Sequence, residues 1–406
     1  MKSNKTTFRS LRCTLNKKNL LTLFGGLTKV SPGLEKLQVC RRTADRRSPI
    51  TFKIISGRMK SLKDLHLTCI DLTPEILNLR HLVNLRLEHP YPNLTAILDL
   101  IASNPLLETI ALGVKCTDQT DPRPKGAITV PRLQTLKFER YSPLPLFHQL
   151  SIPTGASIAF SSWVEPEEVI LPDSLEHLPN LSELRNLYVR PSSGYLIEAS
   201  GPSGEVRFEN VYDPRPELRR LPLQFVEKFR YSDGDPSSGM IGKEPSRGWI
   251  FEVLGRLQHL QTFVIDSCGL RVMKDIFHFL SAQTDRTRGV PPRRKSLPCS
   301  TLSTIVLEVP YDGNWNDWVV PFLQMLRGRA AAGSRLEKFR IVSRPHVQVP
   351  RHGEERRQMK KLVPWVEVKY LRYGSDGTVN ERRARELFEW QYGEEGVLGG
   401  AEVKGE

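Results

Sequence analysis

Apolar residues recur along this chain in one short phrase: an apolar residue, two variable residues, an apolar residue, one variable residue and a last apolar residue. The full copies are LEKLQV (34–39), LKDLHL (62–67), LVNLRL (82–87), LETIAL (107–112), LQTLKF (133–138), LRNLYV (184–189), LQTFVI (260–265), LSTIVL (302–307) and LEKFRI (336–341). FRSLRC (8–13) fits as a partial first copy. The first five full copies begin 20 to 28 residues apart, within the period of about 20–29 residues that is typical of leucine-rich repeats.

Each phrase predicts a short strand whose fourth and sixth residues share one face, because strand side chains alternate with a period of two. Parallel stacking of such strands buries a ladder that no single repeat could bury alone. The residues expected in this ladder are Leu65, Leu67, Leu85, Leu87, Leu136 and Phe138. The predicted fold is therefore an α/β leucine-rich-repeat solenoid over residues 1–375, a curved parallel sheet with short helices on its convex side, irregular and interrupted by long loops.

Short amphipathic helices are predicted between the strands, from apolar residues at the spacing i, i+3, i+4, i+7. The apolar positions are Leu94, Ile97, Leu98 and Ile101 in one helix, and Leu270, Met273, Phe277 and Leu280 in another. Within residues 311–326 a third apolar face contains Trp318, Phe322 and Leu326, and Trp315 is expected to lie outside it. These helices should pack on the strands as an outer layer.

Four stretches rich in proline, glycine, serine and charge are predicted to be exposed loops inserted in the solenoid. They are residues 116–127, 191–204, 232–248 and 284–299. The long interval 189–260 should hold one or two degenerate repeats, and GEVRFENV (204–211) is a candidate strand within it. Residues 376–395 are predicted to form a helix that caps the C-terminal end, as solenoids require, and residues 396–406 a flexible tail.

The stretch LTPEIL (72–77) has two interpretations, because an F-box commonly begins in this way. It lies directly between two copies of the repeat phrase, which leaves no room for the three helices of an F-box. Thr73 is a suitable helix N-cap, and Pro74 suits the first helical position, where its missing N–H has no cost. We therefore predict a single helical turn that connects two strands.

Residues 8 to about 345 resemble the leucine-rich-repeat region of fungal F-box proteins of the mushroom type, in phrases such as LKDLHLTCIDLTPEILNLRHLVNLRLEHP (62–90) and ILDLIASNPLLETIAL (97–112). The resemblance implies a protein-binding module that recognises substrates for a cullin-type ubiquitin ligase. Family members carry the F-box before the first strand, and none is recognised in this sequence. Docking onto the ligase adaptor is therefore in doubt, and both a truncated F-box protein and a standalone module stay open.

Composition places the chain among soluble proteins and adds a charge preference. Of its 406 residues, 39% are hydrophobic, and the net charge is +14, which favours acidic partners. No apolar run approaches the ~20 residues that cross a bilayer. The six cysteines form no C-x-x-C pair and are widely scattered, which suits a reduced protein of the cytoplasm or nucleus. They are Cys13, Cys40, Cys69, Cys116, Cys268 and Cys299.

Motifs that carry chemistry are missing from the sequence. There is no glycine-rich phosphate loop, no G-x-S-x-G and no H-E-x-x-H, and the nine histidines never cluster. We predict no catalytic residue, no metal site and no cofactor. Three basic strings, at 41–47, 286–295 and 351–361, could attract phosphate, but they are expected in loops with interleaved acids and no stacking aromatics. A nucleic-acid-associated protein or a standalone scaffold is the alternative interpretation, and nucleic acid is not the expected partner.

The fifth residue of each phrase should point away from the buried ladder and line the concave surface that solenoids use for partners. In chain order these residues are Gln38, His66, Arg86, Ala111, Lys137, Tyr188, Val264, Val306 and Arg340. All except Ala111 are predicted to bind the partner. The set begins basic or polar and becomes apolar at Val264 and Val306, so the predicted partner is a protein with an acidic segment followed by an apolar one. Arg86 and Tyr188 belong to the residue types that dominate interface energetics.

Overall fold

The computed structural model describes residues 9–15, 33–41, 59–70, 72, 74–89, 94–114, 127–139, 144–147, 149–161, 170–191, 194–232, 248–266, 268–281, 297–309, 315–343 and 353–370. The chain divides into two compact units. The first unit comprises residues 1–261 with 299–301, and the second comprises 262–298 with 302–406.

The first unit is built on a sheet with one strand for each repeat phrase and several more. In spatial order its strands are β1 (Ser10–Leu15), β2 (Lys36–Arg41), β3 (Asp64–Thr68), β4 (Asn84–His89), β5 (Thr109–Val114), β7 (Thr135–Glu139), β9 (Ser157–Ser161), β12 (Gly204–Val211), β11 (Tyr195–Gly201), β10 (Asn186–Pro191) and β13 (Lys228–Ser232). A separate small pair is formed by β6 (Ile128–Thr129) and β8 (Leu150–Ser151). The first eight strands in this spatial order, which end at β12, pair in parallel with their neighbours, as the repeat predicts.

One prediction within this sheet is wrong. Residues 191–204 were expected to form a loop, but half of them form β11, which pairs antiparallel with both β10 and β12. Tyr195, Ile197 and Ala199 are buried while the residues between them are only half-buried, so the stretch has the alternation of a strand. Its proline, glycine and serine residues concentrate at the ends, and Pro202 and Ser203 form the turn between β11 and β12. The candidate strand 204–211 is confirmed as β12.

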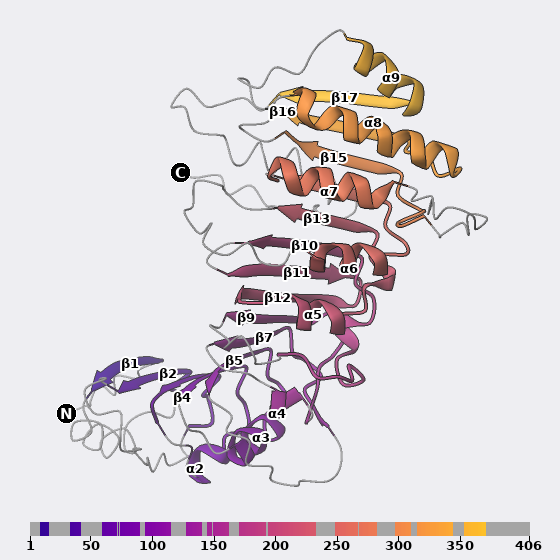
Figure 1. The fold of residues 1–406 in the computed structure, drawn as a ribbon. Coiled ribbons are helices and arrows are strands. Elements are labelled where there is room, and N and C mark those ends of the chain that lie inside the picture. The colour runs from indigo at the N-terminus through magenta and orange to yellow at the C-terminus, as the bar shows by residue number, and fades with distance from the viewer. Residues whose placement is uncertain are drawn as a thin grey trace, which may run out of the picture. The chain divides into compact units, whose positions relative to one another are not determined.

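Helical segments connect the strands of the first unit. They are α2 (Pro74–Leu77), α3 (Leu94–Ala102), α4 (Leu144–Phe147), η3 (Pro179–Leu181), α5 (Arg215–Arg220), η4 (Leu223–Phe225) and α6 (Gly248–Arg256). The four residues of α2 confirm that LTPEIL forms a single helical turn. In α3, Ile97, Leu98 and Ile101 are buried and Leu94 is half-buried, so the predicted apolar face is confirmed. Figure 1 shows α5 and α6 against one face of the sheet.

The core of the first unit lies on the face of the sheet that carries the predicted leucine ladder. All six residues predicted for the ladder are buried. Phe138, Phe160 and Phe208 continue it as a stack in strand register, with ring centroids 5.4 and 4.8 Å apart. Phe147 packs edge-on against the first two of these rings. Such residues contribute the apolar burial that dominates folding.

Buried polar side chains hold successive repeats together. The side chain of Asn104 accepts the Leu82 N–H at 3.0 Å and donates to the carbonyl oxygens of Leu79 and Leu100 at 2.9 and 2.8 Å. The Glu217 carboxylate, also buried, accepts the backbone N–H groups of Ile170 and Leu171 at 2.9 and 3.0 Å. Backbone groups in these turns would otherwise be buried without partners, which is costly.

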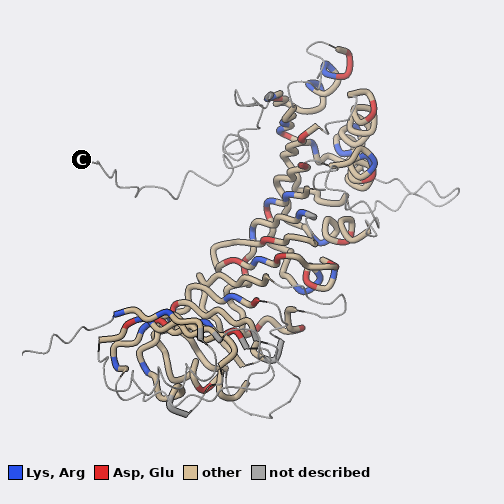
Figure 2. Tube along the Cα trace, turned by 90° about the vertical axis from the view of Figure 1, so that its left-hand side faces the viewer, with Lys and Arg blue, Asp and Glu red and all other residues tan. Residues whose placement is uncertain are grey.

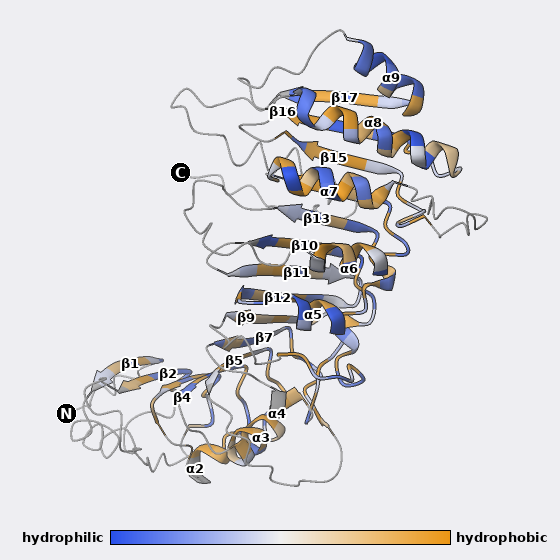
Figure 3. Ribbon diagram, viewed as in Figure 1, coloured by the Kyte–Doolittle hydropathy of each residue, from blue (hydrophilic) through white to orange (hydrophobic). Residues whose placement is uncertain are grey.

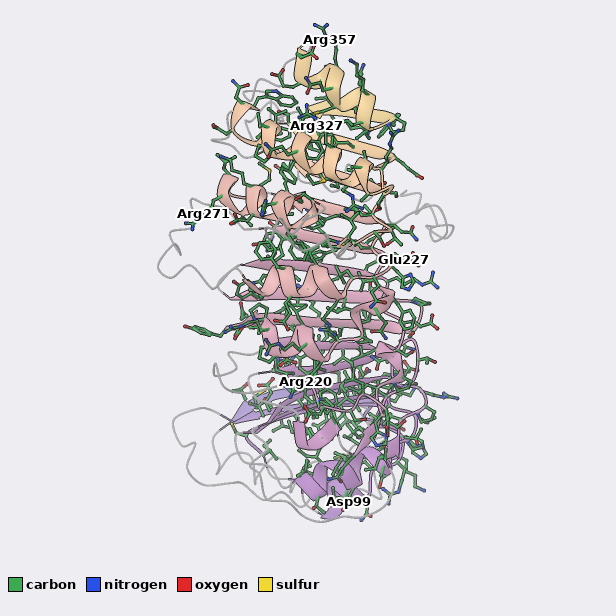
Figure 4. All side chains as sticks on the ribbon, turned by 45° about the vertical axis from the view of Figure 1, so that its right-hand side comes forward. Asp99, Arg220, Glu227, Arg271, Arg327 and Arg357 are labelled. Carbon is green, nitrogen blue, oxygen red and sulfur yellow. The ribbon has the colours of Figure 1, made fainter. Side chains whose placement is uncertain are left out.

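The second unit repeats the same layering with four parallel strands, β14 (Thr262–Asp266), β15 (Thr304–Glu308), β16 (Lys338–Ser343) and β17 (Trp365–Tyr370). Its helices are α7 (Leu270–Leu280), α8 (Trp315–Ala331) and α9 (Glu354–Leu362). They lie side by side on one face of these strands (Figures 1 and 2). The apolar colouring of α7 and α8 alternates with polar residues, whereas α9 is hydrophilic along most of its length (Figure 3). Arg327 on α8 donates to Gln358 on α9 at 2.6 Å, and Figure 4 labels this arginine.

Predictions for the second unit are confirmed in part. Met273, Phe277 and Leu280 of α7 are buried, and so are Trp318, Phe322 and Leu326 of α8. Trp315, expected outside that face, is instead buried, with its ring centroid 4.8 Å from that of Trp318. The basic string 351–361, expected in a loop, lies largely in helix α9, whose buried residue is Met359.

Several predictions fall on parts of the chain outside the described residues. The loops at 116–127, 232–248 and 284–299 lie almost wholly outside them, and the helix at 376–395 and the tail at 396–406 lie wholly outside them. Within the described residues, no helix combines the length and the apolar character that crossing a membrane requires.

Candidate functional site

The face of the first unit's sheet opposite the ladder is polar, and we call it the polar face. Its middle row runs in strand register through Arg12, Gln38, His66, Arg86, Ala111, Lys137, Ala159, Arg207, Glu198, Tyr188 and Arg230. Most of these side chains are exposed or half-buried, in contrast to the buried ladder on the other face. Figure 2 shows positions of both signs of charge along the strands, Lys and Arg in blue and Asp and Glu in red.

Six of the predicted outward residues fall in this one row: Gln38, His66, Arg86, Ala111, Lys137 and Tyr188. Sequence reasoning missed the members contributed by β9, β12, β11 and β13. For β13 a signal was present, since VEKFRY (226–231) has the full repeat phrase. The residues that precede β9 lack the first apolar position of the phrase, so periodicity alone could not find this strand. The strand β12 is the predicted candidate strand 204–211, but its irregular match to the phrase left Arg207 without a predicted place in the row.

The three predicted residues of the second unit are placed differently. Val264, Val306 and Arg340 share a register row with Glu367, but only 5%, 2% and 3% of their surfaces are exposed. The prediction that the two valines offer an apolar surface to a partner is therefore wrong. Arg340 donates from Nε to Glu367 Oε2 at 2.8 Å. The strands β14, β15 and β16 are buried on both faces, as strands of parallel sheets commonly are.

Arg86 occupies the centre of an ion-pair cluster on the polar face. Its Nε donates to Glu88 Oε1 at 2.8 Å, and its Nη2 donates to Glu139 Oε2 at 3.1 Å, across strand β5. Gly113 on β5 pairs in register with Glu88, and an added Cβ there would approach Glu88 Cγ to 3.4 Å. The charge of Arg86, one of the predicted partner-binding residues, is therefore already matched by two carboxylates of the protein.

His66 borders the same cluster without forming a catalytic relay. Its Nε2 lies 3.1 Å from Glu88 Oε1 and 3.3 Å from Thr68 Oγ1. A nucleophile–base–acid relay uses both ring nitrogens, whereas here one nitrogen faces both partners. Burial lowers the pKa of His66 despite the opposing effect of Glu88. Within the described residues no group of His, Cys, Asp and Glu is arranged to hold a metal ion.

Glu88 and Asp64 are held in the ionised form. Burial works to raise the pKa of Glu88, but the hydrogen bond and charge of Arg86, with a smaller effect of His66, bring it below its ordinary value. Burial acts in the same way on Asp64, and hydrogen bonds from Asn84 and Lys36 outweigh it, so that its pKa is also lowered. Lys36 Nζ lies 2.8 Å from Asp64 Oδ2. Most charges of this face are thus paired within the protein.

Three further residues of the row differ in the contacts that their side chains form. Tyr188 is half-buried, and the guanidinium carbon of Arg230 lies 5.0 Å from the centre of its ring, a cation–π distance. Arg207 pairs with Glu198 at 2.8 Å and with Glu209 at 2.7 Å. Lys137, by contrast, is exposed and forms no ion pair with any described residue.

Comparisons with known proteins leave the chain without a family assignment. No protein-family model and no curated protein matches the sequence. Among solved structures, an internalin (inlF) from Listeria monocytogenes is similar at 16% sequence identity, over 79% of this chain and 85% of that chain, with a TM-score of 0.27. A TM-score this low has no weight in an argument about architecture or function.

Proposed function

We propose that this protein is a protein-binding module and that its partner docks on the polar face of the first unit. The observation that carries the proposal is the continuous register row across eleven strands. It exposes polar and aromatic side chains on a sheet whose opposite face is apolar and buried. Stacked repeats of this kind have extended surfaces for partners, and tyrosine and arginine are the residue types enriched where binding energy concentrates.

A narrower proposal is that the module recognises substrates for a cullin-type ubiquitin ligase. Its support is the resemblance of the repeat phrases at 62–90 and 97–112 to the repeat region of fungal F-box proteins. This part of the proposal has its own test, which is whether a ligase adaptor is recovered together with the protein from cells.

The experiment is affinity capture from cells that naturally express the protein, with two variants of the polar face. Arg86→Glu reverses a charge between Glu88 and Glu139, and Tyr188→Ala removes the ring beside Arg230. Because such residues are anchors when they lie in an interface, each variant should reduce recovery of a specific partner by about tenfold or more. The measurement is quantitative mass spectrometry of the captured proteins.

Matched controls lie in the same unit and off the polar face. Arg132→Glu changes the charge equally at an exposed turn, and Tyr212→Ala removes an exposed tyrosine ring. Both should leave recovery unchanged, and circular dichroism melting should show that every variant is folded. If both face variants retain the partner while deletion of residues 233–247 abolishes capture, recognition lies in that segment and the proposal fails.

A further inference from the structure

Two strands of the polar face carry only small outward side chains. On β5 these are Thr109, Ala111 and Gly113, and on β9 they are Ser157, Ala159 and Ser161. We call them the β5 strip and the β9 strip. The strands beside them, β4, β7 and β12, each carry a cation and, two residues later, a glutamate. These pairs are Arg86 with Glu88, Lys137 with Glu139, and Arg207 with Glu209.

The β5 strip is already occupied by the protein's own side chain. Arg86 extends from β4 across β5, and its guanidinium reaches Glu139 on β7. Ala111, which pairs with Arg86 in register, is only 7% exposed. An arginine lying between Glu88 and Glu139 thus fills the space above the small residues of this strip.

The β9 strip is open. Among the described residues, no hydrogen bond or ion pair crosses it from β7 to β12. Arg207 turns instead toward Glu198 on β11 and Glu209 on its own strand. Ser161 is exposed, and Ala159 is half-buried. At one end of the strip the Ser157 hydroxyl donates to Glu205 at 2.5 Å. Lys137 stands beside the strip as an exposed ammonium group without a described ion pair.

We infer that the β9 strip is where the partner enters, and that Lys137 pairs with the carboxylate of an aspartate or glutamate in a protein segment. This inference rests on the proposed function and adds the contact and its chemistry. A carboxylate approaching Arg86 or Arg207 would compete with glutamates already bound there, whereas Lys137 offers an unmatched charge. The small side chains of Ala159 and Ser161 let the incoming group approach the sheet closely.

The charges around the strip favour a protein segment over nucleic acid. Glu139 and Glu209 lie in register on either side of Ser161. A backbone with one phosphate per nucleotide would place several negative charges against these carboxylates, which is unfavourable. A peptide segment with one acidic residue brings only a single negative charge, and basic residues beside that acid would be attracted to Glu139 and Glu209. The expected ligand is therefore an acidic side chain with basic neighbours.

The test uses the full protein with carbon-13 in its alanine methyl groups and nuclear magnetic resonance as the readout. The probes are the blocked peptide Gly-Lys-Glu-Lys-Gly, its glutamine counterpart and a single-stranded hexathymidylate. We expect the glutamate peptide to shift the Ala159 methyl signal and to leave that of Ala111 in place. Exchange of glutamate for glutamine, or Lys137→Gln in the protein, should weaken binding by about fivefold, the upper range for an exposed ion pair.

Lys60→Gln is the matched control, since it removes one exposed lysine charge outside the row and should leave the Ala159 shift unchanged. Equal shifts at Ala159 and Ala111, an unchanged response in Lys137→Gln, or a larger response to the hexathymidylate would each overturn the inference.

Failure of this inference can be distinguished from failure of the proposed function. If face variants lose a captured partner but Lys137→Gln does not, only the β9 strip is wrong. If no partner depends on the face, protein binding there fails as a whole.

Discussion

Arg86 and Lys137 occupy equivalent positions two strands apart, yet one is neutralised and the other is free of described ion pairs. The difference follows from the side chains and the strands they cross. The guanidinium of arginine presents donors in a fork that can bind two carboxylates, whereas lysine carries a compact charge. At position 113 of the strand between them, an added Cβ would approach Glu88 Cγ to 3.4 Å and Glu139 Cβ to 3.7 Å, so glycine leaves room for both of these glutamates. Local charge on this face is therefore set residue by residue and not by the net charge of the chain.

Glu217 yields a prediction at the same scale. Burial raises the pKa of this carboxyl above its ordinary value of 4.5, although hydrogen bonds from Ile170 and Leu171 oppose the change. Between the ordinary and the raised pKa, the folded protein holds a proton that the unfolded chain has lost. Stability therefore falls as pH rises through this window, and the cost is fully present above the folded pKa.

The substitution Glu217→Gln should remove this component of the pH dependence. The measurement is the urea midpoint of unfolding, followed for both proteins from pH 4.5, the ordinary value of this pKa, up to neutral pH. The wild-type midpoint should decline relative to that of the variant as pH rises. Glu176→Gln, at an exposed carboxylate, should show no such trend. A difference between wild type and Glu217→Gln that is constant with pH would contradict the assignment.

At the scale of elements, the β11–β12 hairpin is the feature that departs most from the repeat. It inserts two strands between β9 and β10 and depends on a close backbone approach at Gly201. A Cβ placed there would lie only 1.8 Å from the carbonyl oxygen of Glu183. Backbone cannot move as cheaply as a flexible side chain, so glycine is required at this position by space and not by its φ angle.

Gly201→Ala should therefore destabilise the protein by more than about 3 kcal/mol, the upper range of ordinary overpacking. Gly255→Ala is the matched control, because it lies in helix α6 with nothing within 4 Å of the added carbon. That change should stabilise by up to ~1 kcal/mol, since alanine is the better helix former. Thermal unfolding of the two variants measures both effects, and similar melting temperatures would refute the steric argument.

At the scale of the whole molecule, the net charge of +14 is not gathered on the polar face. There, cations and carboxylates alternate and pair, as at Arg86, Arg207 and Lys36. Interleaved acids weaken attraction for a polyanion, so the excess positive charge should cause only diffuse association with nucleic acid. The basic helix α9 begins with Glu354 and Glu355, which reduce its own attraction for phosphate.

We expect weak retention of a short DNA duplex that is lost between about 50 and 200 mM salt, as counterion release requires for contacts with phosphates alone. Fluorescence anisotropy across this range is the measurement, with two unrelated duplex sequences compared. Equal, salt-sensitive binding of both would agree with diffuse association. Tight and sequence-selective binding at physiological salt would make nucleic acid the partner and displace the protein-binding proposal.

The buried ladder and the six outward residues on β2, β3, β4, β5, β7 and β10 could be predicted from sequence, because both depend on a period of two within each strand and on recurrence along the chain. Leu65 and Leu85 share a face for that local reason, and so do His66 and Arg86. Only the tertiary structure decided which outward residues are available. The period of two predicts on which face of its own strand a side chain lies. Whether that side chain is exposed, and whether its charge is paired, depends on residues far away in the sequence. Glu139, which neutralises Arg86, lies 53 residues further along the chain, and Val264 and Val306 are outward by pattern yet buried.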